Sequence, residues 1–146
     1  MRIAAAALSI VLGSWAAQAF AVCEANTRVT GNAFDTLLQA GTLICGRPAA
    51  GYAGQAADRW QEEHRAGGQL WDYKLGAGHP IDPSKQVGTW SLSANSVTHA
   101  YTGGPSFVWT VHSLNGSTYS FCTGQGGTEV VRAFVTTGTG PCAGYP

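Results

Sequence analysis

The segment from Gly88 to Cys122 constrains the fold more than any other part of the chain. It contains four consecutive short runs in which apolar and polar residues alternate, and turn-forming residues separate the runs. Alternation at period two indicates a strand with one buried face, and four such runs in a row predict an antiparallel meander. The residues that share the buried face are Trp90 and Leu92, then Val97, His99 and Tyr101, then Phe107, Trp109 and Val111, and finally Tyr119 and Phe121.

Strand-like segments on both sides of this meander bring the total to about eight, which is enough to close a small barrel that is filled or holds one small ligand. We therefore predict an all-β fold: a small antiparallel up-and-down β-barrel with one short N-terminal helix. The helix is expected at Asn32–Gly41, with Asn32 as its N-cap and Gly41 at its end. The expected strands are 42–46, 59–66, 69–75, 88–93, 96–102, 106–113, 117–123 and 129–136.

The segment 58–75 is compatible with two structures. Its first part alone suits a helix that an acidic residue caps and a glycine ends. With the residues that follow, it suits a β-hairpin, because Gly67-Gly68 is a two-residue turn signal. We favour the hairpin, since burial of one apolar face outweighs a weak helix propensity. In its register His64 lies opposite Trp71 and Glu62 opposite Tyr73, and one face carries Trp60, Trp71, Tyr73 and Leu75.

The last hairpin of the meander contains a test of its own register. A two-residue turn at Asn115-Gly116 would put the large residues of its two strands on different faces. A three-residue loop, Leu114–Gly116, keeps them on one face and needs Gly116 in the left-handed conformation. We therefore predict the longer loop, which pairs Val111 with Tyr119 and Trp109 with Phe121.

The first residues have the pattern of a secretory signal peptide. A positive charge at Arg2 precedes an apolar run, and small residues offer cleavage sites after Ala19 and Ala21. The apolar run is too short for a stable membrane-spanning helix. We expect a leader at 1–21, a single domain at 22–146, no membrane span, and a secreted or periplasmic location.

Four cysteines follow the leader, and an even number in an oxidising compartment indicates two disulfides. Their spacing does not match a zinc knuckle. We favour Cys45–Cys122 with Cys23–Cys142, which would tie both termini to the barrel; the local pairing of Cys23 with Cys45 and Cys122 with Cys142 remains the alternative. Lipidation of Cys23 is disfavoured because Val22, rather than a small residue, precedes it.

The charge balance excludes one class of partner. The chain has eight basic and eight acidic residues, and loss of Arg2 with the leader leaves seven basic ones. Nucleic-acid binders normally have a basic patch, and this sequence shows none. We expect no nucleic-acid partner.

The favoured hairpin would place a polar spot inside an aromatic cup. Glu62 and His64 would point inward about 7 Å apart along one strand, with His99 facing them from the meander. A buried carboxylate needs a cation, a hydrogen-bond donor or water. Such a cup could bind a small ligand by stacking and hydrogen bonding, although a wet barrel mouth explains the same residues. The candidate ligand-binding residues are Trp60, Glu62, His64, Trp71, Tyr73, His99 and Tyr101.

Metal-dependent and hydrolytic chemistry receive less support. Glu62, His64 and His99 are chemically suitable metal ligands, but alternation alone does not make them converge, so we expect no metal and no cofactor. There is no G-x-S-x-G motif, and disulfides leave no free cysteine. A carboxylate pair of Glu62 with Asp72 or Glu63 would lie on opposite faces of the sheet. We assign no catalytic residue.

Gly88-Thr89-Trp90 at the head of a strand, followed by a meander, resembles the G-x-W signature of lipocalin-like (calycin-like) barrels. In that group the tryptophan closes one end of the barrel and ligands enter from the other. The chain also looks like small secreted bacterial proteins without an established function that combine a helix, a T-L-x-C strand and a G-T-W meander. The resemblance implies a barrel and carries no catalytic residues.

Three functions are compatible with these features. The first is a secreted or periplasmic binding module that holds a small, partly aromatic ligand or a sugar. The second is a protein-binding or inhibitor barrel without a small-molecule ligand. The third is a hydrolytic or metal-dependent enzyme, for which the sequence offers least.

Overall fold

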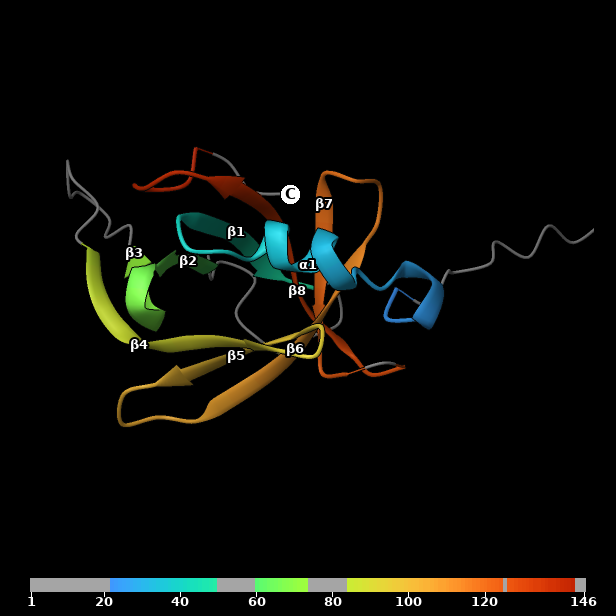
Figure 1. Ribbon diagram of the computed structural model, residues 1–146, viewed down its shortest axis with the longest axis horizontal. Helices are drawn as coiled ribbons and strands as arrows, with labels where there is room; N and C mark the ends of the chain where they lie inside the picture. The colour runs from blue at the N-terminus through green and yellow to red at the C-terminus, as the bar shows by residue number, and fades with distance from the viewer. Residues whose placement is uncertain (1–21, 50–59, 74–83, 125, 144–146) are drawn as a thin grey trace, which may run out of the picture.

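A computed structural model describes residues 22–49, 60–73, 84–124 and 126–143, and its strands form one closed antiparallel barrel (Figure 1). Each strand pairs with the next along the chain, and β8 pairs with β1. The predicted all-β barrel of eight strands with one short helix is confirmed. The segment 1–21, which is expected to be a leader, and Leu75 lie outside the described residues. The elements are η1 (Ala25–Thr27), α1 (Gly31–Leu37), β1 (Thr42–Pro48), β2 (Trp60–Arg65), η2 (Ala66–Gly68), β3 (Gln69–Tyr73), β4 (Ser84–Ser93), β5 (Ser96–Tyr101), β6 (Ser106–Ser113), β7 (Thr118–Cys122) and β8 (Glu129–Thr137).

Helix α1 packs its apolar side into the barrel core. Phe34 and Leu38 are fully buried there, as the spacing of the apolar residues predicts. The helix starts at Gly31, so Asn32 is not its N-cap. The Gly31 N–H donates to the Asn95 side chain (2.5 Å) and joins the start of the helix to the β4–β5 turn. The helix therefore covers the barrel end at which this turn lies.

Residues 60–73 form the β2–β3 hairpin, so the strand alternative for this segment is confirmed. The hairpin connection is Ala66–Gly68, one residue longer than predicted, and both of its glycines have positive φ angles (74° and 73°). Because side chains alternate along a strand, the one additional residue in the connection places every side chain of β3 on the face opposite to the predicted one.

This longer connection corrects the predicted register. Glu62 pairs with Asp72, and Glu63 pairs with Trp71. Trp71 and Tyr73 therefore lie on the outer face of the barrel, on the same side of the sheet as Glu63, and not in the predicted cup. In their place Leu70 and Asp72 share the inner face.

The β6–β7 hairpin also has a longer connection than predicted, but with a different consequence. Val111 pairs with Phe121, and Ser113 pairs with Tyr119. The predicted pairs are thus wrong by two residues, which leaves every side chain on its predicted face. Gly116 has the expected left-handed conformation, with φ at 81°.

Apolar side chains fill much of the barrel interior. Two glycines allow close packing in its wall: a Cβ on Gly88 would lie 2.1 Å from the Ala100 carbonyl oxygen, and one on Gly46 would lie 2.6 Å from Val131. The Gly88 approach lets β4 lie tightly against β5, two residues before Trp90. The buried core cluster comprises Phe34, Leu38, Ile44, Val97, Trp109, Val111, Phe121, Val130 and Ala133.

Two disulfides join Cys23 to Cys122 and Cys45 to Cys142. Neither predicted pairing is observed. Cys45 lies on β1 and Cys122 on β7, with β8 between these two strands. Strands two positions apart lie about 9–10 Å from each other, which is too far for a disulfide. Each disulfide instead ties one terminal segment to the outside of the barrel.

The N-terminal segment covers the outer face of β6 and β7. Arg28 forms a β-bridge with His112, and Val29 donates to the Val111 carbonyl (2.8 Å). His112 faces outward as predicted, yet it is fully buried beneath this segment and lies 3.0 Å from the Thr27 hydroxyl. Among the described residues, no helix has the length and apolar character needed to cross a membrane.

Candidate functional site

Three ionisable side chains are buried together inside the barrel. Glu62 and His64 point inward from β2, two residues apart, and His99 points inward from β5. Their exposed fractions are 2%, 0% and 0%. Strand alternation places each of them on the inner face, and closure of the barrel brings β2 and β5 together across the core. The inward orientation of these three residues was expected, whereas their convergence was not predicted and is a finding of the structure.

A continuous chain of polar contacts links these side chains. The Tyr101 hydroxyl donates to one carboxylate oxygen of Glu62. The other oxygen lies 3.0 Å from His99 Nδ1. His99 Nε2 in turn lies 2.9 Å from His64 Nε2. The chain thus runs from the edge of the core at Tyr101 to the covered barrel end at His64; we call it the Glu–His–His chain.

The other contacts of His64 indicate which imidazole carries the proton between the two rings. A backbone hydrogen bond to Leu38 favours protonation of the His64 ring. The Thr42 hydroxyl lies 3.4 Å from His64 Nδ1 and donates its own proton to the Gln39 carbonyl, so Nδ1 is the nitrogen that carries the proton. His64 Nε2 is then an acceptor, and the proton between the rings belongs to His99. His99 Nδ1 faces Glu62 at 3.0 Å, which is ion-pair distance when the imidazole is protonated. Glu62 Oε2 and His99 Nδ1 meet at ion-pair distance but without the geometry of a hydrogen bond.

Aromatic rings enclose the imidazoles. Trp90 stacks on His64 with centroids 4.4 Å apart and planes 10° apart, and its Nε1 donates to the Arg65 carbonyl (2.9 Å). Trp60 lies against His99 at 5.5 Å. The tryptophan of the G-x-W segment thus packs on the ionisable core and anchors to the β2–β3 connection.

These contacts limit what the Glu–His–His chain can do chemically. The ring nitrogens of His64 and His99 already face Leu38, each other and Glu62, and both rings are fully buried. No nitrogen is left to activate a substrate or bind an ion. Within the described part of the chain, no group of three or more His, Cys, Asp or Glu residues is arranged to hold a metal.

One carboxylate pair differs from the prediction. Glu62 and Asp72 are direct cross-strand partners and share the inner face, so the expectation that they lie on opposite faces is wrong. Only Glu63 points to the other side. The pKa of the Tyr101 hydroxyl is raised, chiefly by its burial. The charge and hydrogen bond of Glu62 raise it further, and Asp72 makes a smaller contribution in the same direction. Tyr101 remains protonated and can keep donating to Glu62.

We expect the protein to lose stability in acid because His64 stays neutral in the folded state. The pKa of His64 is lowered from 6.5 to about 3, mainly by burial and in second place by the charge of His99. Between these values the unfolded chain binds more protons at this position than the folded protein. Stability therefore falls as the pH falls from 6.5 towards 3, by at most about 1.4 kcal/mol per pH unit from this group.

Urea unfolding at several pH values between 7 and 4 measures this dependence. His64→Gln should flatten the decline, whereas Val108→Ala, a change on the exposed outer face, should leave it as in the wild type. A decline equally steep in His64→Gln would contradict the assignment of a neutral buried His64.

The barrel end opposite α1 carries partly exposed aromatic residues. Tyr101 and Trp60 are half-buried there, and Phe107 is 39% exposed although its register places it on the inner side, opposite His99. Phe107 stacks on Trp109 at 5.2 Å with planes 14° apart, and Tyr101 meets its edge at 6.0 Å. We call Trp60, Tyr101, Phe107 and Trp109 the aromatic end of the barrel.

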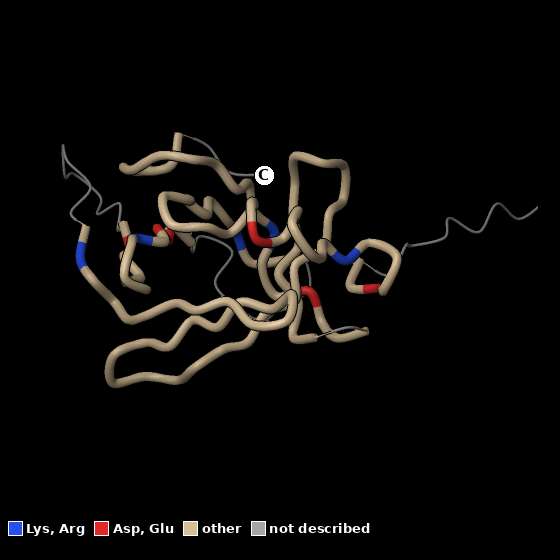
Figure 2. Tube along the Cα trace, viewed as in Figure 1, with Lys and Arg blue, Asp and Glu red and all other residues tan. Residues whose placement is uncertain are grey.

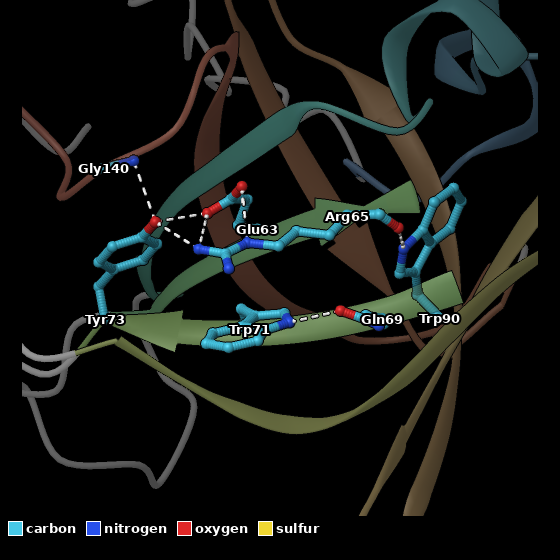
Figure 3. Close-up of polar contacts among 7 residues, drawn as sticks. All are labelled: Glu63, Arg65, Gln69, Trp71, Tyr73, Trp90 and Gly140. Carbon is cyan, nitrogen blue, oxygen red and sulfur yellow. Dashed lines mark hydrogen bonds and ion pairs between the residues drawn. The ribbon is translucent and has the colours of Figure 1, made fainter. Parts of the chain in front are cut away.

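The other two predicted ligand-binding residues belong to an outer-face cluster (Figure 3). Tyr73 donates to the buried carboxylate of Glu63, which Arg65 binds through two hydrogen bonds of 3.0 Å. The Arg65 guanidinium lies 3.9 Å from the centroid of the Trp71 ring, and the Trp71 Nε1 donates to Gln69 (3.1 Å). Trp71 and Tyr73 are therefore occupied by intramolecular contacts.

Sequence reasoning placed Phe107 and Trp109 in the core but did not identify them as site residues. Their signal was their place on the same inner face as His99 and Tyr101, at the strand end where the β5–β6 turn leaves the barrel. The chain matches no protein-family model, and comparisons with curated proteins and with solved structures find no significant similarity.

Proposed function

We propose that this protein is an exported binding module that holds a small ligand, partly aromatic or a sugar, at the aromatic end of its barrel. The supporting observation is Phe107, an inward-facing aromatic side chain that is 39% exposed and stacked on Trp109. An exposed aromatic surface of this kind is a common feature of binding sites. Two disulfides agree with an oxidising compartment outside the cytoplasm.

The donor groups near this end support a ligand with acceptor atoms. Trp109 is 5% exposed, and its Nε1 has no hydrogen-bond partner among the described residues. A buried donor without a partner costs free energy, and an acceptor on a ligand would remove that cost. Carbohydrate hydroxyls and aromatic ethers are suitable acceptors.

The Glu–His–His chain has an indirect role in this proposal. Its buried ion pair holds the Tyr101 hydroxyl on Glu62 and thereby holds the Tyr101 ring against Phe107. Side chains with restricted rotamers lose less entropy when a ligand binds. Glu62, His64 and His99 therefore act as positioning residues, while the aromatic rings make the contacts.

The charge distribution favours a neutral ligand. Between Lys85 and Glu129 the chain contains no lysine, arginine, aspartate or glutamate, so β5, β6 and β7 carry no such charge (Figure 2). An anionic ligand would find no cation on this side of the aromatic end. Neutral sugars and aromatic compounds fit this wall.

A protein-binding function is the second candidate, and one observation favours it. Val108 is 57% exposed on the outer face of β6, directly beside Phe107, which makes a small apolar patch at the barrel end. Exposed patches of this kind often contact proteins. The two candidates differ in which of these neighbouring residues matters.

Titration with p-nitrophenyl-β-glucoside, a neutral sugar with an aromatic group, tests the proposal through tryptophan fluorescence. The wild type should bind, and Phe107→Ala should weaken binding about three- to ten-fold through lost stacking. Val108→Ala is the matched control and should bind like the wild type.

Native mass spectrometry of the purified protein provides a second measurement. It should detect a co-purified small molecule in the wild type and less of that molecule in Phe107→Ala. A wild type that neither binds the glucoside nor carries a small molecule would refute the small-ligand function. If Phe107→Ala and Val108→Ala reduced the measured binding equally, the result would instead favour the protein-binding surface.

A further inference from the structure

Residues 138–143, which follow β8, lie across the outer face of β1, β2 and β3; we call them the C-terminal strap. The Gly140 N–H donates to the Tyr73 hydroxyl (3.1 Å, Figure 3), and the Cys142 N–H donates to the Gln61 side chain (2.8 Å). The Gly138 N–H donates to the Gly41 carbonyl (2.9 Å). The Cys45–Cys142 disulfide makes the attachment covalent.

The strap covers polar groups that an outer barrel face would normally expose to water. Gln61 and Glu63 point outward from β2, yet only 1% of each is exposed. Tyr73 on β3 is 6% exposed and bonds both Glu63 and the strap. The burial of this cluster therefore depends on the strap staying in place.

Noncovalent contacts of the strap are few. Four of its six residues are exposed and the other two are only partly buried. Its apolar contact with the barrel is made chiefly by Cys142, which packs on the small cluster of Leu43, Cys45 and Tyr73. Segments with few buried apolar contacts open at low free-energy cost. The disulfide is thus the main constraint that keeps the strap closed.

The two disulfides differ in their access to solvent. Cys23 is 4% exposed and Cys122 is fully buried. Cys142 is partly exposed, and a groove of about 520 Å³ beside the strap is lined by Cys45, Leu43, Phe134 and Pro141. An attacking thiolate needs a path to a sulfur atom, and the groove beside the strap provides one at the Cys45–Cys142 disulfide.

We propose that the Cys45–Cys142 disulfide is a thiol-exchange site that opens the C-terminal strap, and that its partner is a dithiol reductant such as a thiol–disulfide oxidoreductase. The partner thiolate attacks the Sγ of Cys142, the more exposed of the two cysteines, and the Cys45 sulfur leaves as a thiolate that takes up a proton. The second partner thiol then attacks the mixed disulfide, so that Cys142 is released as a thiol and the partner is oxidised to a disulfide.

The apolar groove suits the partner because it offers a surface for the peptide that carries the attacking cysteine. Leu43 and Phe134 line it next to the sulfur atoms, and no charged side chain is among its lining residues. Release of the strap would uncover Glu63, Tyr73 and Gln61 while the closed barrel and the Cys23–Cys122 disulfide stay intact. The site thus changes one outer face without unfolding the protein.

Brief treatment with limiting dithiothreitol, followed by N-ethylmaleimide labelling and peptide mapping, tests the first part. Cys45 and Cys142 should be labelled roughly ten-fold or more faster than Cys23 and Cys122, because exchange depends on access. Equal rates, or faster labelling of Cys23 and Cys122, would overturn the proposal.

Hydrogen exchange of the selectively reduced protein tests the second part. The Gly140 and Cys142 amides should lose protection, while amides of β5 and β6 should keep theirs. The double variant Cys45→Ser/Cys142→Ser should show the same open strap without reductant, and Cys23→Ser/Cys122→Ser should leave the strap protected. Strap amides that stay protected after reduction would refute the opening, and general loss of protection would show unfolding instead.

Discussion

Glu62→Leu should lower the free energy of unfolding by about 3–5 kcal/mol, because it leaves the buried His99 without its carboxylate partner. His99 is fully buried and 3.0 Å from that carboxylate, so water cannot take its place without rearrangement of the core. The Tyr101 hydroxyl loses its acceptor in the same variant. Urea unfolding followed by tryptophan fluorescence measures the loss, since Trp60 and Trp90 contact the two histidines.

A double variant separates the ion pair from simple packing. Glu62→Leu/His99→Phe removes both polar partners and fills the space with apolar atoms, so it should recover at least about half of the lost stability. Glu129→Gln is the control, because Arg132, the partner of Glu129, is 41% exposed and Gln keeps an oxygen that can accept from Ser120, so the change should cost about 1 kcal/mol or less. If Glu62→Leu cost no more than Glu129→Gln, the assigned ion pair would be wrong.

Cys23→Ser/Cys122→Ser should lower the free energy of unfolding by about 2–5 kcal/mol. The disulfide joins residues 99 positions apart, so its loss frees a long loop in the unfolded chain. It also releases the N-terminal segment that covers His112. Urea midpoints under non-reducing conditions measure the effect.

The second disulfide supplies a comparison with nearly the same loop. Cys45 and Cys142 are 97 positions apart, so chain entropy alone predicts an equal loss for Cys45→Ser/Cys142→Ser. We expect the smaller loss in that variant, because the strap makes few buried contacts whereas Cys122 lies fully inside the structure. A larger loss at Cys45 and Cys142 would contradict the view of the strap as a separately opening segment.

Much of the fold could be predicted because its main signal is local. The alternation from Trp90 to Phe121 predicts which side chains share a face. These faces are observed in the structure, even between β6 and β7, where the pairing differs by two residues from the predicted one. The strand bounds of β6 match the prediction at both ends. An error of two residues in the strand pairing leaves each side chain on its predicted face, so the predicted faces are correct even where the predicted pairs are not.

The candidate site could be predicted only in part. Glu62, His64, His99, Tyr101 and Trp60 share the interior as expected, because β2 and β5 each alternate regularly. Trp71 and Tyr73 do not, because one extra residue between β2 and β3 reverses the faces of β3. Two adjacent glycines are compatible with either turn length, and the sequence holds no further signal that distinguishes them.

By itself the sequence determined the all-β class, the strand order along the chain, and the inward face of β2 and of the meander. Each of these properties depends on residues close together in the chain. Only the tertiary structure decided the disulfide partners, the face of β3, the proton arrangement of His64 and His99, and the burial of Glu63 beneath the strap. These depend on distances between strands that are far apart in sequence, and a closed barrel sets those distances only when every turn has its final length.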